Sequence, residues 1–358
     1  MCELDDLMDN IAKMAARVGA VGVALRPHVK SHKSAFIAKR QLDAGAAGLA
    51  FAKLSEAEAV IGRLLADGHE ESVSALLTSP LVGDASARRA ARLAERCDLM
   101  IAVDHVDGVD EISSALGEVG SRASIVCDVD VGLARTGVTG ASAALEIAQR
   151  VTQHRSLSFA GVQGYGGHLQ HIVGRDARRS ATIEASARLS EVIDALEDEG
   201  FDVRVRTGGG TGTAGIDIEL GILNELQPGS YVFMDREYRD ALALDAEGDF
   251  RQSLLLATSV ISANQTGFVT VDAGLKSMAT DAGPPTVVGH GADATFHFFG
   301  DEQGLITEPA SGVFSRGDVV HLVPPHCDPT VDRHDVIWLV RGDVVLGALR
   351  VDARGCSQ

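Results

Sequence analysis

The feature that most constrains the fold is a regular alternation of short apolar runs with helical stretches through the first two thirds of the chain. Candidate helices lie between the runs, such as residues 55–67, which open with a capping pattern (Ser55, Glu58), and residues 175–200, which end at a glycine. The eight runs with strand character are residues 21–25, 47–52, 73–78, 99–103, 123–131, 159–165, 203–207 and 231–234. Eight strand–helix units in about 220 residues predict a (β/α)8 TIM-like barrel.

The pattern changes after residue 235, where strand-like runs follow one another without helices between them. These runs are residues 254–263, 268–273, 294–299, 319–323, 336–340 and 344–351. They predict an all-β domain. The first 15 residues have a helical pattern and precede the first barrel strand. We therefore expect a barrel over residues 16–245 and a β domain formed by residues 1–15 plus 246–358.

Composition excludes several classes of protein. No stretch approaches the roughly 20 apolar residues of a membrane helix, and the amino terminus is acidic where a signal peptide would be basic. We therefore expect a cytoplasmic protein without membrane contact. The five cysteines are odd in number and scattered without a C-x-x-C pair, which indicates reduced thiols and no zinc knuckle.

The net charge of −18 makes nucleic acid an unfavourable partner. Only six of the 32 basic residues are lysine. An acidic surplus with few lysines resembles proteins of salt-loving organisms, and ordinary acidity from a GC-rich genome is the alternative.

A basic octapeptide, Arg26-Pro27-His28-Val29-Lys30-Ser31-His32-Lys33, follows the first strand-like run. This position is the carboxyl end of a barrel strand, where such folds expose reactive groups. Neighbouring positive charge should lower the pKa of Lys30 and make its amine a nucleophile. Schiff-base chemistry with a carbonyl such as pyridoxal phosphate (PLP) needs that property. A solvated basic loop is the alternative.

Three further segments at strand ends carry candidate site residues. Residues 207–213, Thr-Gly-Gly-Gly-Thr-Gly-Thr, follow the seventh strand, where barrels commonly bind phosphate through backbone N–H groups. Residues 128–137 place Arg135 at the rim of the barrel after the fifth strand. Arg135 can contact a cofactor there, or it can form an ion pair with Asp128 or Asp130 that holds the loop. Residues 161–171 leave the sixth strand with His168 and His171, two imidazoles able to take a proton. The phosphate candidates are Gly209, Gly210, Thr211 and Gly212.

The segment Pro324-Pro325-His326-Cys327-Asp328 predicts a cation site in the β domain. In an extended chain His326 and Asp328 face the same side, and Cys327 points away. Imidazole with carboxylate favours manganese or magnesium over zinc, although zinc remains possible.

These motifs, in this order along the chain, resemble the D-threonine aldolase and D-serine dehydratase family. The octapeptide resembles that family's R-P-H-x-K-T-H-K segment, with Ser31 in place of threonine. The resemblance implies fold-type III PLP architecture, as in alanine racemase, with a homodimer and PLP on Lys30. It implies that Arg135 contacts the phenolic oxygen of PLP, that Tyr165 lies beside the cofactor, and that His171 is the base. Residues 227–231 match the family's second phosphate-side segment, which adds Ser230 and Tyr231.

The resemblance also bears on the metal and on departures from the family pattern. Family dehydratases tend to carry His-x-Cys where this chain has His326-x-Asp328, and the aldolases carry His-x-Asp. Residues 272–276 and 301–304 also match family segments, but Gln303 stands where histidine is frequent. This departure argues against a role for Gln303, and Asp301 is a candidate contributor across a subunit boundary. Two roles remain open for His168, namely binding of the substrate carboxylate and capping of the loop.

The leading hypothesis is a PLP- and divalent-metal-dependent aldolase that cleaves D-3-hydroxy amino acids, such as D-threonine or D-3-hydroxyaspartate, to glycine and an aldehyde. A dehydratase of the same fold, acting on D-serine or D-threo-3-hydroxyaspartate, is the nearest alternative. A non-catalytic PLP-binding protein would resemble the barrel alone, and no segment resembles the second catalytic tyrosine of the racemases. The sequence does not identify the β-substituent or the native metal.

Overall fold

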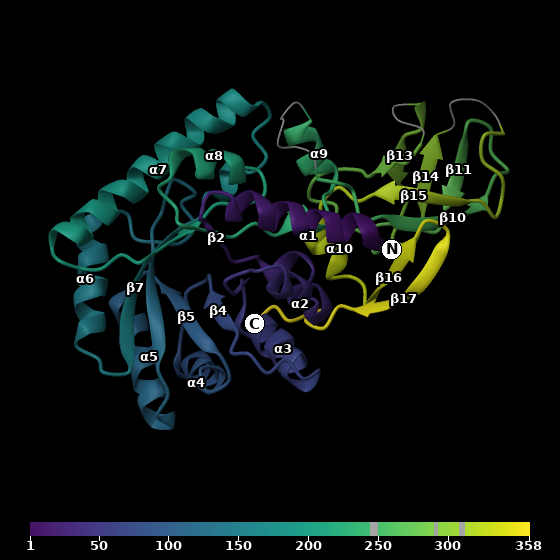
Figure 1. Ribbon diagram of the computed structural model, residues 1–358. Helices are drawn as coiled ribbons and strands as arrows, with labels where there is room; N and C mark the ends of the chain where they lie inside the picture. Colours follow the sequence, from purple (N-terminus) through teal and green to yellow (C-terminus); the bar gives the residue numbers. More distant parts are fainter. Residues whose placement is uncertain (244–249, 290–292, 308–311) are drawn as a thin grey trace. The chain divides into compact units, whose positions relative to one another are not determined.

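The computed structural model describes residues 1–243, 250–289, 293–307 and 312–358 (Figure 1). The chain forms two compact units. The barrel unit comprises residues 14–30, 35–229 and 356–358, and the β unit comprises residues 1–13, 31–34 and 230–355. The predicted boundary between residues 245 and 246 lies outside the described residues.

The core of the barrel unit is an eight-stranded sheet in which every paired strand is parallel to its neighbour. A bridge between His28 and Ala50 joins its two end strands, so the sheet closes into the predicted barrel. In sheet order the strands are β2 (Ala24–Leu25), β9 (Glu225–Leu226), β8 (Val205–Gly208), β7 (Leu157–Gly164), β6 (Ala123–Asp128), β5 (Asp98–Val103), β4 (Ser74–Leu77) and β3 (Leu49–Phe51). Strands such as β3 are buried throughout, as parallel strands covered by helices should be.

Helices connect the strands and lie outside them (Figure 1). They are α2 (Ala35–Asp43), α3 (Leu54–Ala66), α4 (Asp84–Leu93), α5 (Val106–Val119), α6 (Ala141–Thr152), α7 (Arg175–Asp198) and α8 (Ala214–Leu220). Helix α1 (Leu4–Gly19) precedes the first barrel strand, and residues 4–13 of it belong to the β unit. Helix α3 buries Ala57, Ile61 and Leu64, which share one face. The predicted Ser55–Glu58 cap is wrong: Glu56 accepts hydrogen bonds from the N–H groups of Ala52 (3.1 Å) and Lys53 (3.2 Å) instead.

The eighth predicted strand, residues 231–234, is also wrong. The eighth barrel strand is β9, and the apolar run after it forms the 3-10 helix η3 (Ser230–Val232). The carbonyl of Ser230 accepts hydrogen bonds from the N–H groups of Phe233 (3.0 Å) and Met234 (2.8 Å), which turns the chain. Residues 227–231 therefore leave the last barrel strand, whereas the sequence had placed them at its entrance.

The β unit contains the predicted all-β domain. A six-stranded sheet runs in the order β12 (Thr286–Val287), β15 (Val319–Val323), β10 (Leu256–Ser262), β11 (Phe268–Val271), β14 (Gly304–Thr307) and β13 (Phe296–Phe298). A three-stranded sheet runs in the order β1 (Cys2–Glu3), β16 (Val336–Arg341) and β17 (Val344–Arg350). The larger sheet encloses a core that includes Val271, Met278, Phe296 and Leu322. Helices α9 (Arg236–Leu242) and α10 (Cys327–Val331) complete the unit.

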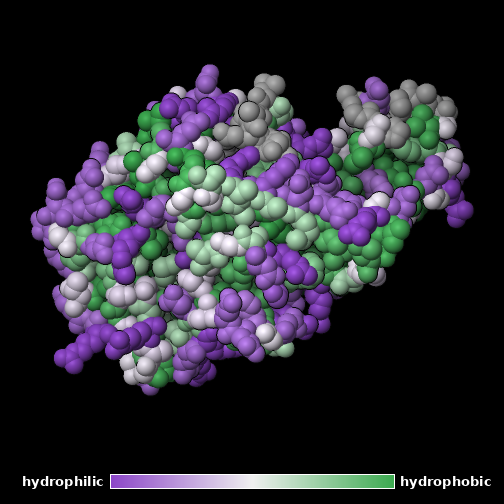
Figure 2. All heavy atoms as spheres, viewed as in Figure 1, coloured by the Kyte–Doolittle hydropathy of each residue, from purple (hydrophilic) through white to green (hydrophobic). Residues whose placement is uncertain are grey.

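No helix of the described residues is long and apolar enough to cross a membrane. Figure 2 shows hydrophobic side chains gathered over β16 and β17 on the face in view. Four residues there are strongly exposed: Trp338 (53%), Val344 (60%), Val345 (60%) and Leu346 (45%). Strand β17 lies at the edge of its sheet, so this patch is an apolar surface beside an unpaired strand edge.

Candidate active site

A cavity of about 600 Å³ lies within the barrel unit. It is lined by residues at the carboxyl ends of barrel strands and by the loops that follow them. Among the predicted site residues, Lys30, Arg135 and Tyr165 line it. Other polar or charged residues in its wall are His28, Lys53, Thr78, Ser79, Asp104, Asp128, Asp130, Thr136, Gln163 and Gln227. The fold therefore brings the predicted cofactor lysine and two of its predicted neighbours to one cavity.

Lys30 lies in the 3-10 helix η1 (Val29–Ser31) just after β2. The charge argument made for it from the sequence is not supported by its surroundings. The guanidinium of Arg26 is buried and forms an ion pair with Glu225 at 2.8 Å, and Lys33 pairs with Asp332 at 2.7 Å. Each of these cations therefore has its own carboxylate, and the octapeptide is not an uncompensated cluster of positive charge.

His28 supports the Lys30 segment as a neutral imidazole. The hydroxyl of Thr78 donates to the carbonyl of Phe51 at 3.1 Å, so it accepts from Nε2 of His28 at 3.3 Å. The other ring nitrogen, Nδ1, accepts the backbone N–H of Lys30 at 3.4 Å. One nitrogen donates and the other accepts, which is the pattern of an uncharged ring.

A buried polar network forms one side of the cavity. The amide nitrogen of Gln163 donates to Asp128 Oδ1 at 2.8 Å, and the amide of Gln227 donates to Oε1 of Gln163 at 3.3 Å. Burial raises the pKa of Asp128, and the nearby carboxylate of Asp104 acts in the same direction. Sequence reasoning gave Gln163 and Asp104 no role, although a glutamine inside a buried strand and an aspartate directly after one were detectable signals.

Arg135 is exposed toward the cavity, and its guanidinium carbon lies 5.6 Å from the centre of the Tyr165 ring. It forms no ion pair within the described part of the chain, so the alternative pairing with Asp128 or Asp130 is not observed. Asp130 instead accepts the N–H groups of Gly132 and Ala134, both at 2.9 Å, and so shapes the loop. The arrangement leaves a cation beside an aromatic face in the cavity wall.

The two predicted histidines lie in the segment after β7 but do not line the cavity. His168 is exposed within the 3-10 helix η2 (Gly167–Leu169). His171 is half-buried and lies just beyond that helix. Gln170, between them, is almost fully buried, and sequence reasoning gave it no role.

The glycine loop, residues 208–213, follows β8 as predicted and leads into α8. Gly209 has a φ of +66°, a conformation that favours glycine. None of Gly209, Gly210, Thr211 and Gly212 lines the cavity. Gln227, which does line it, donates its backbone N–H to the carbonyl of Gly208 at 2.8 Å, at the start of the loop. Its position after the seventh barrel strand suits a phosphate.

The predicted metal residues lie in the β unit, but not in an extended chain. His326 is extended, whereas α10 begins at Cys327, so the argument that Cys327 points away from Asp328 is wrong. The Cys327 thiol lies 3.3 Å from Asp328 Oδ1, and the hydroxyl of Ser230 donates to the same oxygen at 3.3 Å. Burial raises the pKa of Cys327 well above that of a free thiol, which disfavours a thiolate ligand. Tyr231, next to Ser230, is fully buried beside Phe250.

His326 has the surroundings of a metal-binding imidazole. Its Nδ1 lies 2.7 Å from Oδ2 of Asp281, a carboxylate that sequence reasoning missed, and this bond fixes the ring with Nε2 on its other side, as in imidazoles that bind metals. Burial would lower the pKa of His326, but Asp328, Asp281 and Asp235 together raise it. The described residues contain no group of three or more metal-ligating side chains. A cation at His326 and Asp328 would therefore need oxygen ligands from water or substrate.

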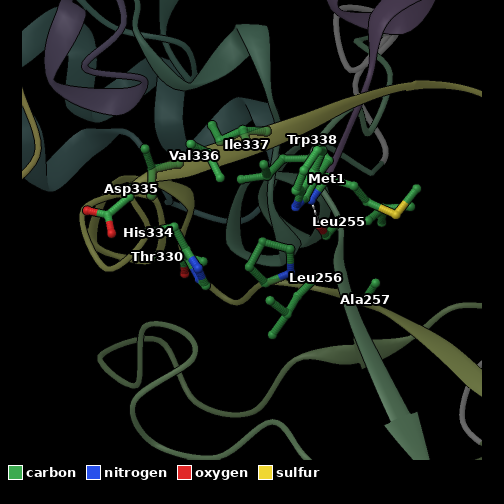
Figure 3. A pocket seen from close by; sticks show the side chains of 13 residues that line it. Met1, Leu255, Leu256, Ala257, Thr330, His334, Asp335, Val336, Ile337 and Trp338 are labelled. Carbon is green, nitrogen blue, oxygen red and sulfur yellow. Dashed lines mark hydrogen bonds between the residues drawn. The ribbon is translucent and has the colours of Figure 1, made fainter. Parts of the chain in front are cut away.

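A second cavity, of about 360 Å³, lies within the β unit (Figure 3). Its wall includes Leu255, Ile337 and Trp338, and the ammonium group of Met1 donates to the carbonyl of Leu255 at 2.7 Å. None of the predicted site residues lines it. The candidate active site is therefore the cavity of the barrel unit, and the His326–Asp328 pair is a donor set of the β unit.

Comparison with known proteins identifies the family of the chain. Residues 2–237 match the family described as "Alanine racemase, N-terminal domain", and residues 253–340 match "Putative serine dehydratase domain". The chain is 35% identical to a D-threonine aldolase of an Arthrobacter species over 98% of this chain and 90% of that protein. It is 36% identical to a 3-hydroxy-D-aspartate aldolase of Paracoccus denitrificans (strain Pd 1222) over 99% and 90%.

A solved structure extends the similarity to three dimensions. The crystal structure of D-threonine aldolase from Filomicrobium marinum superimposes with a TM-score of 0.95 at 31% identity, covering 100% of this chain and 95% of that one. Both the sequence and the fold match over nearly the entire length. The chain therefore belongs to the D-threonine aldolase and D-serine dehydratase family, within the group built on the alanine racemase barrel.

Proposed function

We propose that the protein cleaves D-3-hydroxy amino acids, such as D-threonine and D-3-hydroxyaspartate, to glycine or a related amino acid and an aldehyde. The observation that carries the proposal is the similarity to two aldolases over nearly the whole chain, together with aspartate at position 328. Incubation with D- and L-3-hydroxy amino acids, with glycine and ammonia measured separately, tests it.

The family implies pyridoxal phosphate, and the barrel cavity fits this cofactor. The cavity wall contains a lysine, an arginine and an aromatic ring, and the arginine forms no ion pair within the described residues. A glycine loop follows β8, the strand that pairs with β7. We propose that Lys30 holds the cofactor covalently and that Arg135 and Tyr165 contact its ring. Gly209, Gly210, Thr211, Gly212, Ser230 and Tyr231 are the proposed phosphate-side residues. The N–H groups of Gly210 and Gly212 donate to the side chains of Thr213 and Gln170, so these two glycines would shape the loop and leave the N–H contacts with a phosphate to other residues. When bound, PLP supplies a conjugated ring that accepts the electrons released at Cα.

We propose that His326 and Asp328 hold a divalent metal, with manganese or magnesium favoured and zinc possible. The bond between His326 and Asp281 supports this role because it leaves Nε2 to face a cation. Such an ion supplies Lewis acidity toward the substrate's β-hydroxyl. His171 is the proposed acceptor of the hydroxyl proton, on the basis of its place in the family motif; it lies in the segment that follows β7.

Residues 16–245 are accordingly the proposed PLP-binding part, and residues 1–15 plus 246–358 the metal-binding part. We also propose a homodimer. The exposed apolar patch formed by Trp338, Val344, Val345 and Leu346 supports it, since isolated proteins rarely expose such a surface beside a free strand edge (Figure 2).

One observation favours a second activity, namely the match of residues 253–340 to a serine dehydratase domain. In that reaction Lys30 would take the Cα proton, and the hydroxyl would leave as water. Asp328 favours the aldolase over the dehydratase, because a carboxylate stands where the family dehydratases tend to have a thiolate.

The acidic surface leads to a prediction about salt. We propose that the surface is adapted to high salt, on the basis of the −18 charge and six lysines. Raising KCl from about 0.1 M to about 2 M should then raise the melting temperature steadily, because salt screens the repulsion among carboxylates. Thermal unfolding followed by circular dichroism measures this. A melting temperature that stays constant over that range would contradict the proposal.

A further inference from the structure

We infer that Gln170, Thr213 and Asp217 form a positioning network that holds the glycine loop in its phosphate-binding shape, and so sets the preference of the site for a phosphorylated cofactor. The inference rests on the proposed PLP function and names residues that do not touch the reacting atoms. All three residues lie in the barrel unit and are buried.

The side-chain amide of Gln170 ties two loops together. Its Nε2 donates to the carbonyl of Gly166 and to the hydroxyl of Thr213, both at 3.1 Å. Its Oε1 accepts the backbone N–H of Gly212 at 3.0 Å. Both ends of the amide are therefore used, and the segment after β7 fixes the position of the segment after β8.

The hydroxyl of Thr213 has a defined direction. It accepts the N–H of Gly210 at 3.3 Å and the amide of Gln170, and it donates its one proton to Asp217 Oδ2 at 2.6 Å. A hydroxyl has a single proton to donate. Thr213 therefore supports the loop from within the protein and has no proton left to give to a phosphate.

The glycines of the loop are required by this network. A Cβ on Gly210 would collide with the side-chain oxygen of Gln170, and a Cβ on Gly212 would collide with the Gln170 carbonyl. At Gly209 a Cβ would collide with the carboxyl group of Asp217. The loop lies directly against Gln170 and Asp217, so a change that removes the contacts of either side chain should alter the loop.

The charge of Asp217 matters because it lies beneath this loop. Burial raises the pKa of Asp217 to about 7, while the hydrogen bond from Thr213 acts in the opposite direction. The carboxyl group borders a cavity of about 20 Å³ whose wall includes Val131, Leu169 and Leu189. The residues that line this cavity come from β7, the segments after β6 and β7, helix α7, the glycine loop, helix α8 and the segment after α8. Among these lining residues, Asp217 is the only one with a titratable side chain.

A neutral carboxyl group below the loop is compatible with a phosphate dianion, whereas a carboxylate repels it. The network should therefore hold phosphate better below pH 7 than above it. Lys30, Arg135 and Tyr165, which are proposed to contact the cofactor's ring, are not part of the network, so the effect should be confined to the phosphate.

The test compares pyridoxal phosphate with pyridoxal, which lacks the phosphate, by titrating each into cofactor-free protein and following the visible absorption. Thr213→Val should weaken binding of pyridoxal phosphate by roughly 10- to 100-fold, the cost of leaving buried polar groups unpaired. It should change pyridoxal binding by less than about threefold, within the scatter of such effects. Thr213→Ser keeps the hydroxyl and should restore the preference for the phosphorylated form.

Asp217→Asn provides a second test with a side chain of nearly the same shape. It should bind pyridoxal phosphate like the wild type at pH 6, and roughly threefold to tenfold more tightly at pH 8.5, where the wild-type carboxyl group is ionised. Equal weakening of both ligands by Thr213→Val, or no advantage of Asp217→Asn at pH 8.5, would overturn the inference. If the wild-type protein binds neither compound at Lys30, the proposed PLP function fails, and the inference falls with it.

Discussion

Lys30→Ala should yield a colourless protein whose aldolase activity is lower by on the order of 10³-fold or more, since the residue proposed to hold the cofactor is gone. The wild-type protein should be yellow, and borohydride should fix the cofactor on Lys30. Lys30 follows β2 at the carboxyl end of the barrel, in the wall of the 600 Å³ cavity. Absorption spectra and mass spectrometry of the reduced protein measure both outcomes.

Lys53 provides the matched control for this experiment. It lines the same cavity, and is therefore the strongest competing amine on geometric grounds. Lys53→Ala should remain yellow and retain the borohydride-fixed cofactor on Lys30. A reduced adduct on Lys53, Lys33 or Lys276 would refute the assignment of Lys30.

Removal of the metal should abolish glycine formation without bleaching the protein. Lys30 is proposed to hold the cofactor through a covalent bond, whereas His326 and Asp328 are proposed to hold the metal as ligands, so a chelator should remove the metal and leave the cofactor. Manganese or magnesium should restore activity. Asp328→Asn should lower the apparent metal affinity and reduce activity by roughly 10²- to 10⁴-fold at limiting metal, because it removes one of the two proposed protein ligands.

Cys327→Ala is the control for the metal experiment. The Cys327 thiol lies next to Asp328, but burial raises its pKa and keeps it protonated. The variant should therefore keep its metal affinity. Metal titrations followed by activity separate the two variants, and a larger loss of affinity for Cys327→Ala than for Asp328→Asn would assign the metal to the thiol.

The architecture was predictable because strand and helix periods alternate regularly, and seven of the eight barrel runs coincide with strands. The eighth run failed for a physical reason. Residues 231–234 are apolar enough for a buried strand. They are buried in the β unit instead, where a 3-10 helix begins at Ser230. The two-residue strand that completes the barrel, Glu225–Leu226, is too short to give a periodic signal.

The site was predictable in its residue types and less so in its electrostatics. Lys30, Arg135 and Tyr165 follow strands, and strands of a barrel end at one rim, so their common cavity follows from topology. The partners of Arg26 and Lys33 lie 199 and 299 residues away in sequence, and no local pattern indicates such pairs. No local pattern indicates the contact of Asp281 with His326 or that of Gln170 with the glycine loop either, because these partners are also far apart in the sequence.

The central claim is most directly tested by the products formed from D-threonine and D-3-hydroxyaspartate in the presence of pyridoxal phosphate and manganese. The account predicts glycine and an aldehyde in equal amounts from the D enantiomers, with little ammonia. Ammonia and a 2-oxo acid as the main products would contradict the aldolase proposal and support the dehydratase in its place.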